Sequence, residues 1–387
     1  MDAIKFSEML SDKHIINLKK LKYKYSDDFD DFISVLKSSY YNLLPINDFK
    51  GNNFVYLNSC TGINLDAVKL LYTSQSSAYG TKALEEEIVA TSAIESIDFS
   101  RDSVRKIMKG FVPKDEEENR IFGLKQGFEF ISNKSNKITE ENIYKLYMMS
   151  IGNFLDDEDK LKQGNYYRHD EVFVMGQAIE HSGIDCKKLP DYMKSFVDFA
   201  NADDRINDLL KATILHFYIA YLHPYFDGNG RMARLVHMWF LIQKGYESTL
   251  FVPFSSYIEK SRKKYYDAYT LIEDNYSLSG VIDITPFLLY FIQNVYDKMT
   301  DNTIKTDTLE VYNSVLAAGK ITEKESKLWS FVLSAYAGDT FTTKQLEKDF
   351  GDAAFATVRS FVMKFTELGL LNAQKMKNKV LYSINQN

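Results

Sequence analysis

The chain has 387 residues, of which 45% are hydrophobic and 14% aromatic, so it is long and apolar enough to bury two or three domain cores. Its 47 basic and 53 acidic residues leave a formal charge of −6, which argues against nucleic acid or an anionic membrane as the main partner. Cys60 and Cys186 are too far apart for a disulfide framework or a cysteine metal site. The first ten residues carry charges where a signal peptide would be apolar, and no apolar run has the length of a membrane span. We therefore expect a cytoplasmic protein without a membrane contact.

The N-terminal part leads into a helix with an unusual carboxylate. Residues 1–75 read as helices and loops, with loops or short strands at 40–64. The next helix is expected over 81–97, where Leu84, Ile88 and Glu95 share one stripe and Thr91 lies one turn before Glu95. A carboxylate on an inward stripe needs a cation, because an unpaired buried charge is very costly. Periodicity leaves two readings open, a paired Glu95 or a rim residue at the helix end.

Further helices and one hairpin follow in the middle of the chain. Helices are expected over 98–112, 120–132 and 139–151, with an acidic loop at 113–119, and another helix over 189–202. The aromatic and β-branched stretch 164–176, bounded by glycines, predicts a β-hairpin. His169 reads as a surface residue of that hairpin, and His181 reads as part of a loop.

Two apolar helices then flank a short polar turn. The helices are predicted over 209–222 and 235–242, and the turn between them reads His-Pro-Tyr-Phe-Asp-Gly-Asn-Gly-Arg-Met-Ala-Arg over 223–234. Pro224 cannot continue the first helix, so His223 should end it. Arg231 and Arg234 should then lie in the first turns of the second helix, on one side.

That turn has the parts of a phosphate-transfer site. The free N–H groups of a helix N-terminus bind phosphate, and Asn229 with Gly228 and Gly230 can extend the anion-binding concavity. The two arginines would add charge-assisted bonds to phosphate oxygens. Asp227 suits Mg²⁺, which binds through one or two carboxylates together with phosphate and water. His223 can take the proton of an attacking hydroxyl. His216, seven residues earlier on the same helix face, could support His223 but reads better as a core histidine, and His237 receives no role.

The C-terminal part predicts a separate small domain. Helices are expected at 259–272 and 284–299, and the polar stretch 300–308 reads as a linker. Three helices, at 323–336, 345–350 and 353–368, then precede two short strands, at 370–372 and 380–384, around a basic turn. This order is typical of a winged helix. Its third helix carries only Arg359 and Lys364 as cations, which favours a scaffold or dimerisation role over DNA binding.

Two stretches resemble motifs of one protein family. Residues 223–234 are similar to the signature of Fic (Fido) domain proteins, His-Pro-Phe-x-(Asp/Glu)-Gly-Asn-Gly-Arg-x-x-Arg, with Tyr225 in place of the usual Phe. Residues 91–96 resemble the family's inhibitory motif, (Ser/Thr)-x-x-x-Glu-(Gly/Asn), with Ser96 in place of Gly or Asn. The resemblance covers roughly residues 80–290.

The resemblance implies a mainly α fold, with a Fic/Fido helical core, a small β-hairpin flap and, here, a C-terminal winged helix. We expect an N-terminal helical region over 1–135 that includes the inhibitory helix 81–97. A Fido catalytic domain is expected over 136–300 and a winged-helix-like domain over 305–387.

The resemblance also implies roles for single residues. His223 would be the catalytic base, and Asp227 would hold the metal. The nucleotide would be bound by Phe226, Asp227, Gly228, Asn229, Gly230, Arg231 and Arg234. Thr91 and Glu95 would form the inhibitory motif, in which Glu95 pairs with Arg234 and blocks productive placement of the ATP γ-phosphate. The flap, with Glu171, Val172, Phe173 and Val174, would align the target by main-chain pairing.

The implied activity is that of a protein adenylyltransferase with ATP and Mg²⁺, which transfers AMP to a Ser, Thr or Tyr hydroxyl of a target protein or of itself. Two alternatives stay open. One is a related activity of the same site, either transfer from another nucleotide or removal of AMP with Glu95 placing a water. The other is a DNA-binding regulator whose Fido domain senses nucleotide. ATP and a protein substrate are the expected partners, a homodimer is left open, and DNA binding by 305–387 is not favoured.

Overall fold

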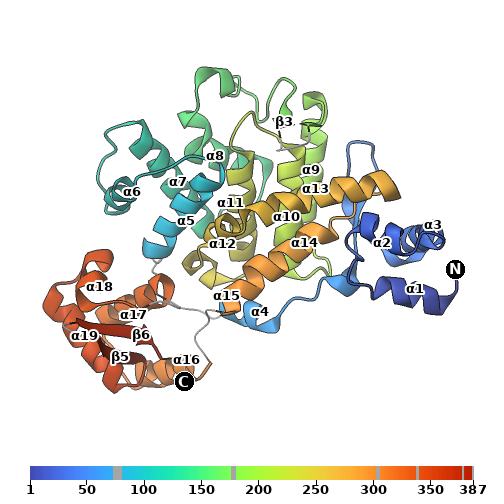
Figure 1. Cartoon of the computed structure of the whole chain (residues 1–387). Coiled ribbons are helices and arrows are strands. Elements are labelled where there is room, and N and C mark those ends of the chain that lie inside the picture. The colour runs from blue at the N-terminus through green and yellow to red at the C-terminus, as the bar shows by residue number, and fades with distance from the viewer. Residues whose placement is uncertain (73–80, 176–179, 302–305, 337–339, 377–378, 386–387) are drawn as a thin grey trace.

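The computed structural model describes residues 1–72, 81–175, 180–301, 306–336, 340–376 and 379–385. The chain is mainly helical, as predicted, and its described strands form three separate antiparallel pairs (Figure 1). The helices of the first half are α1 Ala3–Leu10, α2 Leu18–Lys24, α3 Phe29–Val35, α4 Leu65–Tyr72, α5 Thr81–Ile94, α6 Arg101–Met108, α7 Glu116–Ser132 and α8 Glu140–Ser150. Those of the second half are α9 Leu189–Asn201, α10 Asp208–Leu222, α11 Asn229–Gln243, α12 Phe254–Lys260, α13 Arg262–Ser279, α14 Thr285–Phe291, α15 Asp297–Asp301, α16 Thr306–Ala317, α17 Glu323–Ala335, α18 Thr343–Phe350 and α19 Phe355–Glu367. The strands are β1 Asn42–Asn47, β2 Asn53–Tyr56, β3 Phe173–Met175, β4 Glu180–Ser182, β5 Leu371–Met376 and β6 Lys379–Ile384.

The buried apolar side chains form three clusters. The large central cluster runs from Leu44 to Met299 and takes in both α5 and the α10–α11 pair. A small cluster under α1–α3 packs Met9, Leu21 and Phe32. A third cluster lies within the C-terminal part, around Trp329 and Phe361. No described helix is long and apolar enough to cross a membrane.

Helices α10 and α11 pack against each other in the middle of the central cluster (Figure 1). Nearly every residue of α10 is buried, and α11 is buried from Arg231 to Ile242, which accounts for their apolar sequences. Asn207 caps the start of α10 through its side chain, which accepts from the N–H of Leu209. The helix ends where predicted, because His223 adopts a left-handed conformation (φ 50°) directly before Pro224.

Helix α5 lies against α12 and α6, and against α17 and α18 near the C-terminus. Its last turn closes with a bond from the Ile97 N–H to the Ser92 carbonyl (3.0 Å), while Ser96 takes a left-handed φ of 62°. This is the ending that helices usually make with glycine. The chain leaves the helix there, so the predicted helix over 98–112 is shorter than expected and α6 covers only 101–108.

Three other boundaries differ from the sequence prediction. The acidic stretch 113–119, predicted as a loop, enters α7 at Glu116, because Asp115 caps that helix and three glutamates complement its positive end. The helix predicted at 259–272 is two helices, α12 and α13, divided at Ser261. The stretch predicted as a linker up to residue 308 already contains the start of α16.

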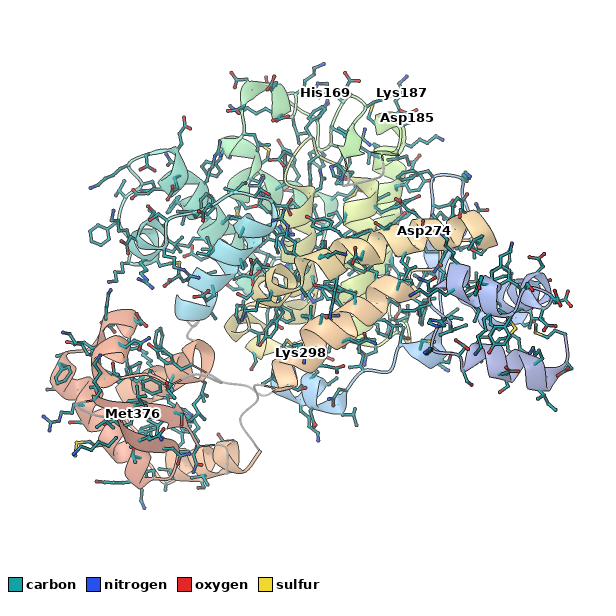
Figure 2. The ribbon with its side chains drawn as sticks, in the orientation of Figure 1. His169, Asp185, Lys187, Asp274, Lys298 and Met376 are labelled. Carbon is teal, nitrogen blue, oxygen red and sulfur yellow. The ribbon has the colours of Figure 1, made fainter. Side chains whose placement is uncertain are left out.

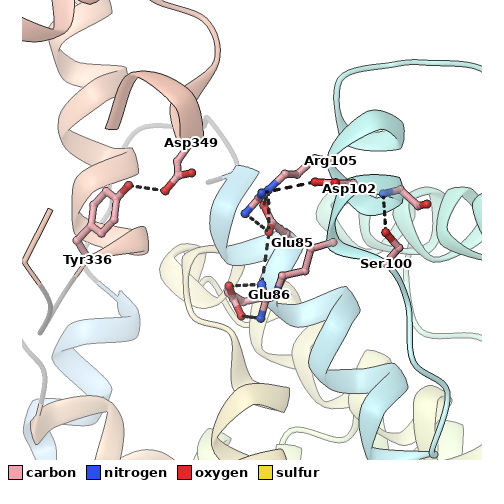
Figure 3. A network of polar contacts seen from close by, with 9 residues as sticks. Glu85, Glu86, Ser100, Asp102, Arg105, Tyr336 and Asp349 are labelled. Atoms are coloured by element: carbon pink, nitrogen blue, oxygen red, sulfur yellow. Dashed lines mark hydrogen bonds and ion pairs between the residues drawn. The ribbon is translucent and has the colours of Figure 1, made fainter. Parts of the chain in front are cut away.

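The C-terminal module, residues 306–385, has its own core and contacts the outer end of α5. Helices α17 and α18 lie beside α5. Figure 3 shows Tyr336, which donates to Asp349 (2.7 Å), facing Arg105, which donates to Glu85 at the start of α5 (3.1 Å). Glu86, the next residue of α5, accepts two bonds from Arg101 (2.6 and 3.0 Å). Charged groups therefore bond α5 to α6 at the place where this module lies against α5.

Candidate functional site

The turn between α10 and α11 has a fixed backbone. Gly228 takes a left-handed φ of 84° directly before α11, and a Cβ there would come within 2.6 Å of Ile151. Asn229 closes the loop with both ends of its amide, accepting from the Tyr225 N–H (3.0 Å) and donating to the Tyr225 carbonyl (2.8 Å). The side chain of Asn229 is thereby occupied, so what it offers to an anion is its backbone N–H in the first helical turn.

Arg168 holds the other side of the turn. Its Nε donates to the His223 carbonyl (2.8 Å), and its backbone N–H donates to the Pro224 carbonyl (2.8 Å). Arg168 is 2% exposed and also donates to the carbonyls of Asp170 and Ile184. Arg168 thus binds four backbone oxygens, three through its buried guanidinium and one through its main-chain N–H. These bonds hold the backbone at His223 in place.

Two arginines, Arg231 and Arg234, lie in the first two turns of α11. Arg231 donates to the Asp227 carboxylate (2.7 Å), and Arg234, 2% exposed, donates to Glu95 (2.7 Å). One nitrogen of each, Nε of Arg231 and Nη1 of Arg234, is buried without a hydrogen-bond partner among the described residues. Buried donors of this kind are costly when left unpaired. We call the α11 N-terminus at 228–230 together with these two arginines the phosphate cradle.

Helix α5 ends at the phosphate cradle, and Glu95 is paired there, which is one of the two readings that periodicity left open. Arg234 donates from Nε to the Thr91 hydroxyl (2.7 Å) and from Nη2 to both the Thr91 carbonyl (2.9 Å) and Glu95. Burial acts to lower the pKa of Arg234, but the charge and hydrogen bond of Glu95, together with Tyr265 and Glu87, outweigh it, so this pKa lies above the ordinary value. A Cβ on Gly230 would overlap a Glu95 carboxylate oxygen. The Glu95 carboxylate therefore lies directly against the backbone where an anion would approach α11.

A second carboxylate of α5, which the sequence did not single out, lies deeper. Glu87 accepts from the N–H of Ser255 (2.8 Å) and from its hydroxyl, at the start of α12. Burial raises the pKa of Glu87 to about 7, although the Ser255 bonds and the charge of Arg234 act in the opposite direction. Glu87, Thr91 and Glu95 are spaced four apart, so one face of α5 carries all three toward Arg234 and α12.

The histidines other than His223 are placed as core or surface residues. His216 is fully buried and bonded to the Tyr265 hydroxyl (2.9 Å), and burial holds its pKa well below the usual range. His237 is buried beside Tyr296, and burial lowers its pKa to about 3. His169 packs edge-on against Phe226 at 4.9 Å. Both buried rings are neutral near pH 7, so they do not compete with the arginines for an anion.

A pocket of about 140 Å³ opens beside Asp227 and Arg231. Ile97, just past the end of α5, lines it, as does Arg120 of α7, which the sequence analysis had not marked. Asp227 is half exposed and only one of its oxygens is bonded to Arg231. Among the described residues no cluster of three or more His, Cys, Asp or Glu side chains could hold a metal. One exposed carboxylate beside a phosphate-binding cradle fits Mg²⁺ brought with a polyphosphate rather than a metal held by the protein alone.

The hairpin predicted over 164–176 lies further along the chain. Phe173–Met175 pairs with Glu180–Ser182, and the Gly183 N–H extends the pairing to Val172. Residues 176–179 lie outside the described residues. Of the predicted flap residues, Glu171 and Val172 precede the strand, and Phe173 and Val174 form it. His181, predicted in a loop, is in the second strand.

Tyr166 and Tyr167, which were predicted to lie in a strand of the hairpin, instead pack against α8. Tyr166 stacks on Tyr144 (4.7 Å), and Tyr167 donates to Glu140 (2.7 Å). Figure 2 shows His169 at the same end of the molecule as Asp185 and Lys187, which lead into α9. The segments before and after the hairpin therefore lie together, and His169 of the first segment contacts Phe226 of the turn between α10 and α11.

Part of the chain is similar to a known protein family. Residues 137–241 match the model of the Fic/DOC family. A protein adenylyltransferase Fic of Drosophila willistoni is 26% identical over 191 residues, or 48% of this chain and 34% of the relative. That of Aedes aegypti is 26% identical over 218 residues, or 54% of this chain and 40% of the relative. The chain thus spans less than half the length of these relatives.

A solved structure supports the same fold. A Fic family protein from Desulfovibrio desulfuricans is similar over 84% of this chain and 96% of its own, with a TM-score of 0.50 and 17% identity. At that identity the likeness concerns the fold alone. Residues 137–241 are thus similar to the Fic/DOC family, and the mainly helical fold that the signature predicted is confirmed.

The departure at Tyr225 gives a stability prediction. Its hydroxyl is buried without a partner among the described residues, while its ring stacks on Tyr147 at 3.6 Å. Tyr225→Phe keeps the stack and removes the unpaired hydroxyl, so it should raise the free energy of unfolding by about 1 kcal/mol in urea denaturation. Tyr147→Phe, which removes a 3.4 Å bond to the Asp227 carbonyl, is the control and should lower it slightly. A loss of stability in Tyr225→Phe would contradict this assignment.

Glu87 gives a pH prediction. Its folded pKa of about 7 exceeds the ordinary 4.5, so the folded protein keeps a proton that the unfolded chain releases. The contribution to stability is full below pH 4.5 and is lost as the pH rises to about 7. Glu87→Gln mimics the protonated form and keeps one donor and one acceptor for Ser255. Between pH 4.5 and 8 the wild type should lose about 3 kcal/mol of unfolding free energy relative to this variant. Parallel pH profiles of the two proteins would refute the buried, protonated carboxyl.

Proposed function

We propose that this protein is an adenylyltransferase that moves AMP from ATP to a hydroxyl of a protein, either a target or itself, and that Glu95 holds it inactive. The observation that carries the proposal is the state of Arg234. This arginine is 2% exposed, reaches the N-terminus of α11, and is bound there by Glu95 and Thr91. A buried cation at a helix N-terminus is suited to a phosphate, and a carboxylate of the same chain takes that place.

The nucleotide would bind along the phosphate cradle. The backbone N–H groups at 228–230 would receive a phosphate, Arg231 and Arg234 would bind the remaining phosphate oxygens, and Phe226 would contribute to the nucleotide pocket. Arg231 must then leave Asp227, to which it is bonded in the free protein. Asp227 would hold Mg²⁺, which neutralises charge on the leaving pyrophosphate.

The transfer step places His223 as the general base. The target hydroxyl gives its proton to the imidazole of His223, and its oxygen forms a bond to the α-phosphorus as the bond from that phosphorus to the bridging oxygen breaks. Pyrophosphate leaves with the electron pair of that bond. The bonds from Arg168 to the His223 and Pro224 backbone keep the base in place while the substrate enters. The strand at 173–175 would align the target segment by main-chain pairing.

Inhibition would follow from direct competition. The Glu95 carboxylate lies against Gly230 and binds a nitrogen of Arg234, so a terminal phosphate meets a negative charge and lacks its partner arginine. Helix α5 would act as the inhibitory helix. The C-terminal module has the helix and strand order of a winged helix, and its sparse cations favour a scaffold role over DNA binding.

Label transfer from α-³²P-ATP with Mg²⁺ tests this proposal. Glu95→Gly should raise labelling of protein roughly ten-fold or more over wild type, since a competing hydrogen bond between charged groups, worth about 1.5–3 kcal/mol, is removed. The double variant Glu95→Gly with His223→Ala should transfer no label although it still binds ATP.

The other outcomes separate the alternatives. Label loss from AMP-modified protein that depends on Glu95 would favour AMP removal. Transfer from another nucleotide but not from ATP would change the donor. No transfer in any variant, together with salt-sensitive DNA binding by the full chain, would favour the regulator and overturn the transferase.

A further inference from the structure

Arg262, the first residue of α13, contacts the end of the helix that carries Glu95. Its Nη1 donates to the Ala93 carbonyl (3.2 Å), and its Nη2 donates to the Ser96 hydroxyl (3.1 Å). Neither the Fic signature nor the inhibitory motif includes this residue. Like Arg234, which donates to the Thr91 carbonyl, Arg262 donates from another helix to the backbone of the last turn of α5.

The end of α5 needs such a contact because of Ser96. Its φ of 62° is a conformation that glycine adopts freely and that residues with a Cβ rarely adopt. The turn is closed by two backbone bonds, from the Ser96 N–H to the Ala93 carbonyl (2.9 Å) and from the Ile97 N–H to the Ser92 carbonyl (3.0 Å). Arg262 binds the same Ala93 carbonyl and the Ser96 side chain. Its positive charge also meets the negative end of the helix.

The same arginine lies beside the phosphate cradle. Its guanidinium carbon is 5.9 Å from the ring centre of Tyr266, one turn further along α13. Burial raises the pKa of Tyr266, and the charges of Glu95, Arg234 and Arg262 act on the same hydroxyl. Helix α5 is thus held to the α12–α13 segment at two points, Glu87 on Ser255 and the last turn on Arg262. Glu95 lies within the second of these.

We propose that Arg262 is a positioning residue for inhibition: it holds the last turn of α5 in the left-handed ending that puts the Glu95 carboxylate on Arg234. This inference rests on the proposed inhibitory function of Glu95. A glycine at position 96 would take this left-handed conformation without strain, whereas Ser96 is stabilised in it by the bonds of Arg262. Without Arg262 the last turn unwinds more readily, Glu95 leaves Arg234 for part of the time, and the phosphate cradle opens.

The activity test uses four variants of the full chain. Arg262→Ala should raise AMP transfer roughly five- to thirty-fold over wild type, the range that corresponds to one or two kcal/mol of lost local stability. In the Glu95→Gly background Arg262→Ala should change nothing, because the group it positions is gone. Ser96→Gly added to Arg262→Ala should restore inhibition, since glycine takes the left-handed conformation without strain. Lys263→Ala is the matched control, because its exposed side chain pairs only with Asp267 on the same helix.

A second measurement decides the inference without any activity. Hydrogen exchange of the Ser96 and Ile97 amides should be faster in Arg262→Ala than in wild type and unchanged in Lys263→Ala. If Glu95→Gly transfers no AMP, the proposed function fails, and the exchange result still decides whether Arg262 holds the end of α5. Unchanged exchange in Arg262→Ala, or an equal change of transfer with and without Glu95, would overturn the positioning role.

Discussion

A buried arginine is the constraint on which the site depends. Arg234 stands in the second turn of α11 with 2% of its surface exposed, and a guanidinium so far from water must be bound by acceptors or an anion. In the free protein α5 supplies them, through Thr91 and Glu95. Helix α5 meets this need from inside the central cluster, where its apolar side chains pack and its last turn binds Arg234. A phosphate bound at the N-terminus of α11 would compete with Glu95 for the guanidinium of Arg234.

The supports of the site come from segments far apart in the chain. Arg168, before the hairpin, binds the backbone around His223, and Ser255 of α12 binds Glu87 of α5. Arg262 of α13 binds the last turn of the same helix. At the other end of α5, the ion pairs of Glu85 with Arg101 and Arg105 lie next to the C-terminal module (Figure 3). Helix α5 is therefore contacted near both of its ends by segments that are distant in the sequence.

The sequence predicted the parts of this site whose cause is local. Pro224 and the glycines determine where α10 stops and α11 starts, so His223 and the two arginines are found where expected. The apolar stripe of α5 left Glu95 open between a paired residue and a rim residue, and its pairing with Arg234 was implied only by the resemblance. Contacts between distant segments have no such local signal. Ser255, Arg168 and Arg262 look like ordinary loop or helix residues, and the aromatic run around Tyr166 has strand character but stacks on Tyr144 instead. The hairpin was misplaced for that reason, because tertiary packing overrode local propensity.

The most direct test of the account asks which group leaves ATP and whether Glu95 governs that event. Glu95→Gly and wild type would be incubated with Mg²⁺ and ATP labelled in parallel at the α- or the γ-phosphorus, and the label on protein and in pyrophosphate would be measured. The account predicts α-label on protein and γ-label in pyrophosphate, both strong in Glu95→Gly and weak in wild type. Label from the γ-phosphorus on protein, or equal transfer with and without Glu95, would contradict it.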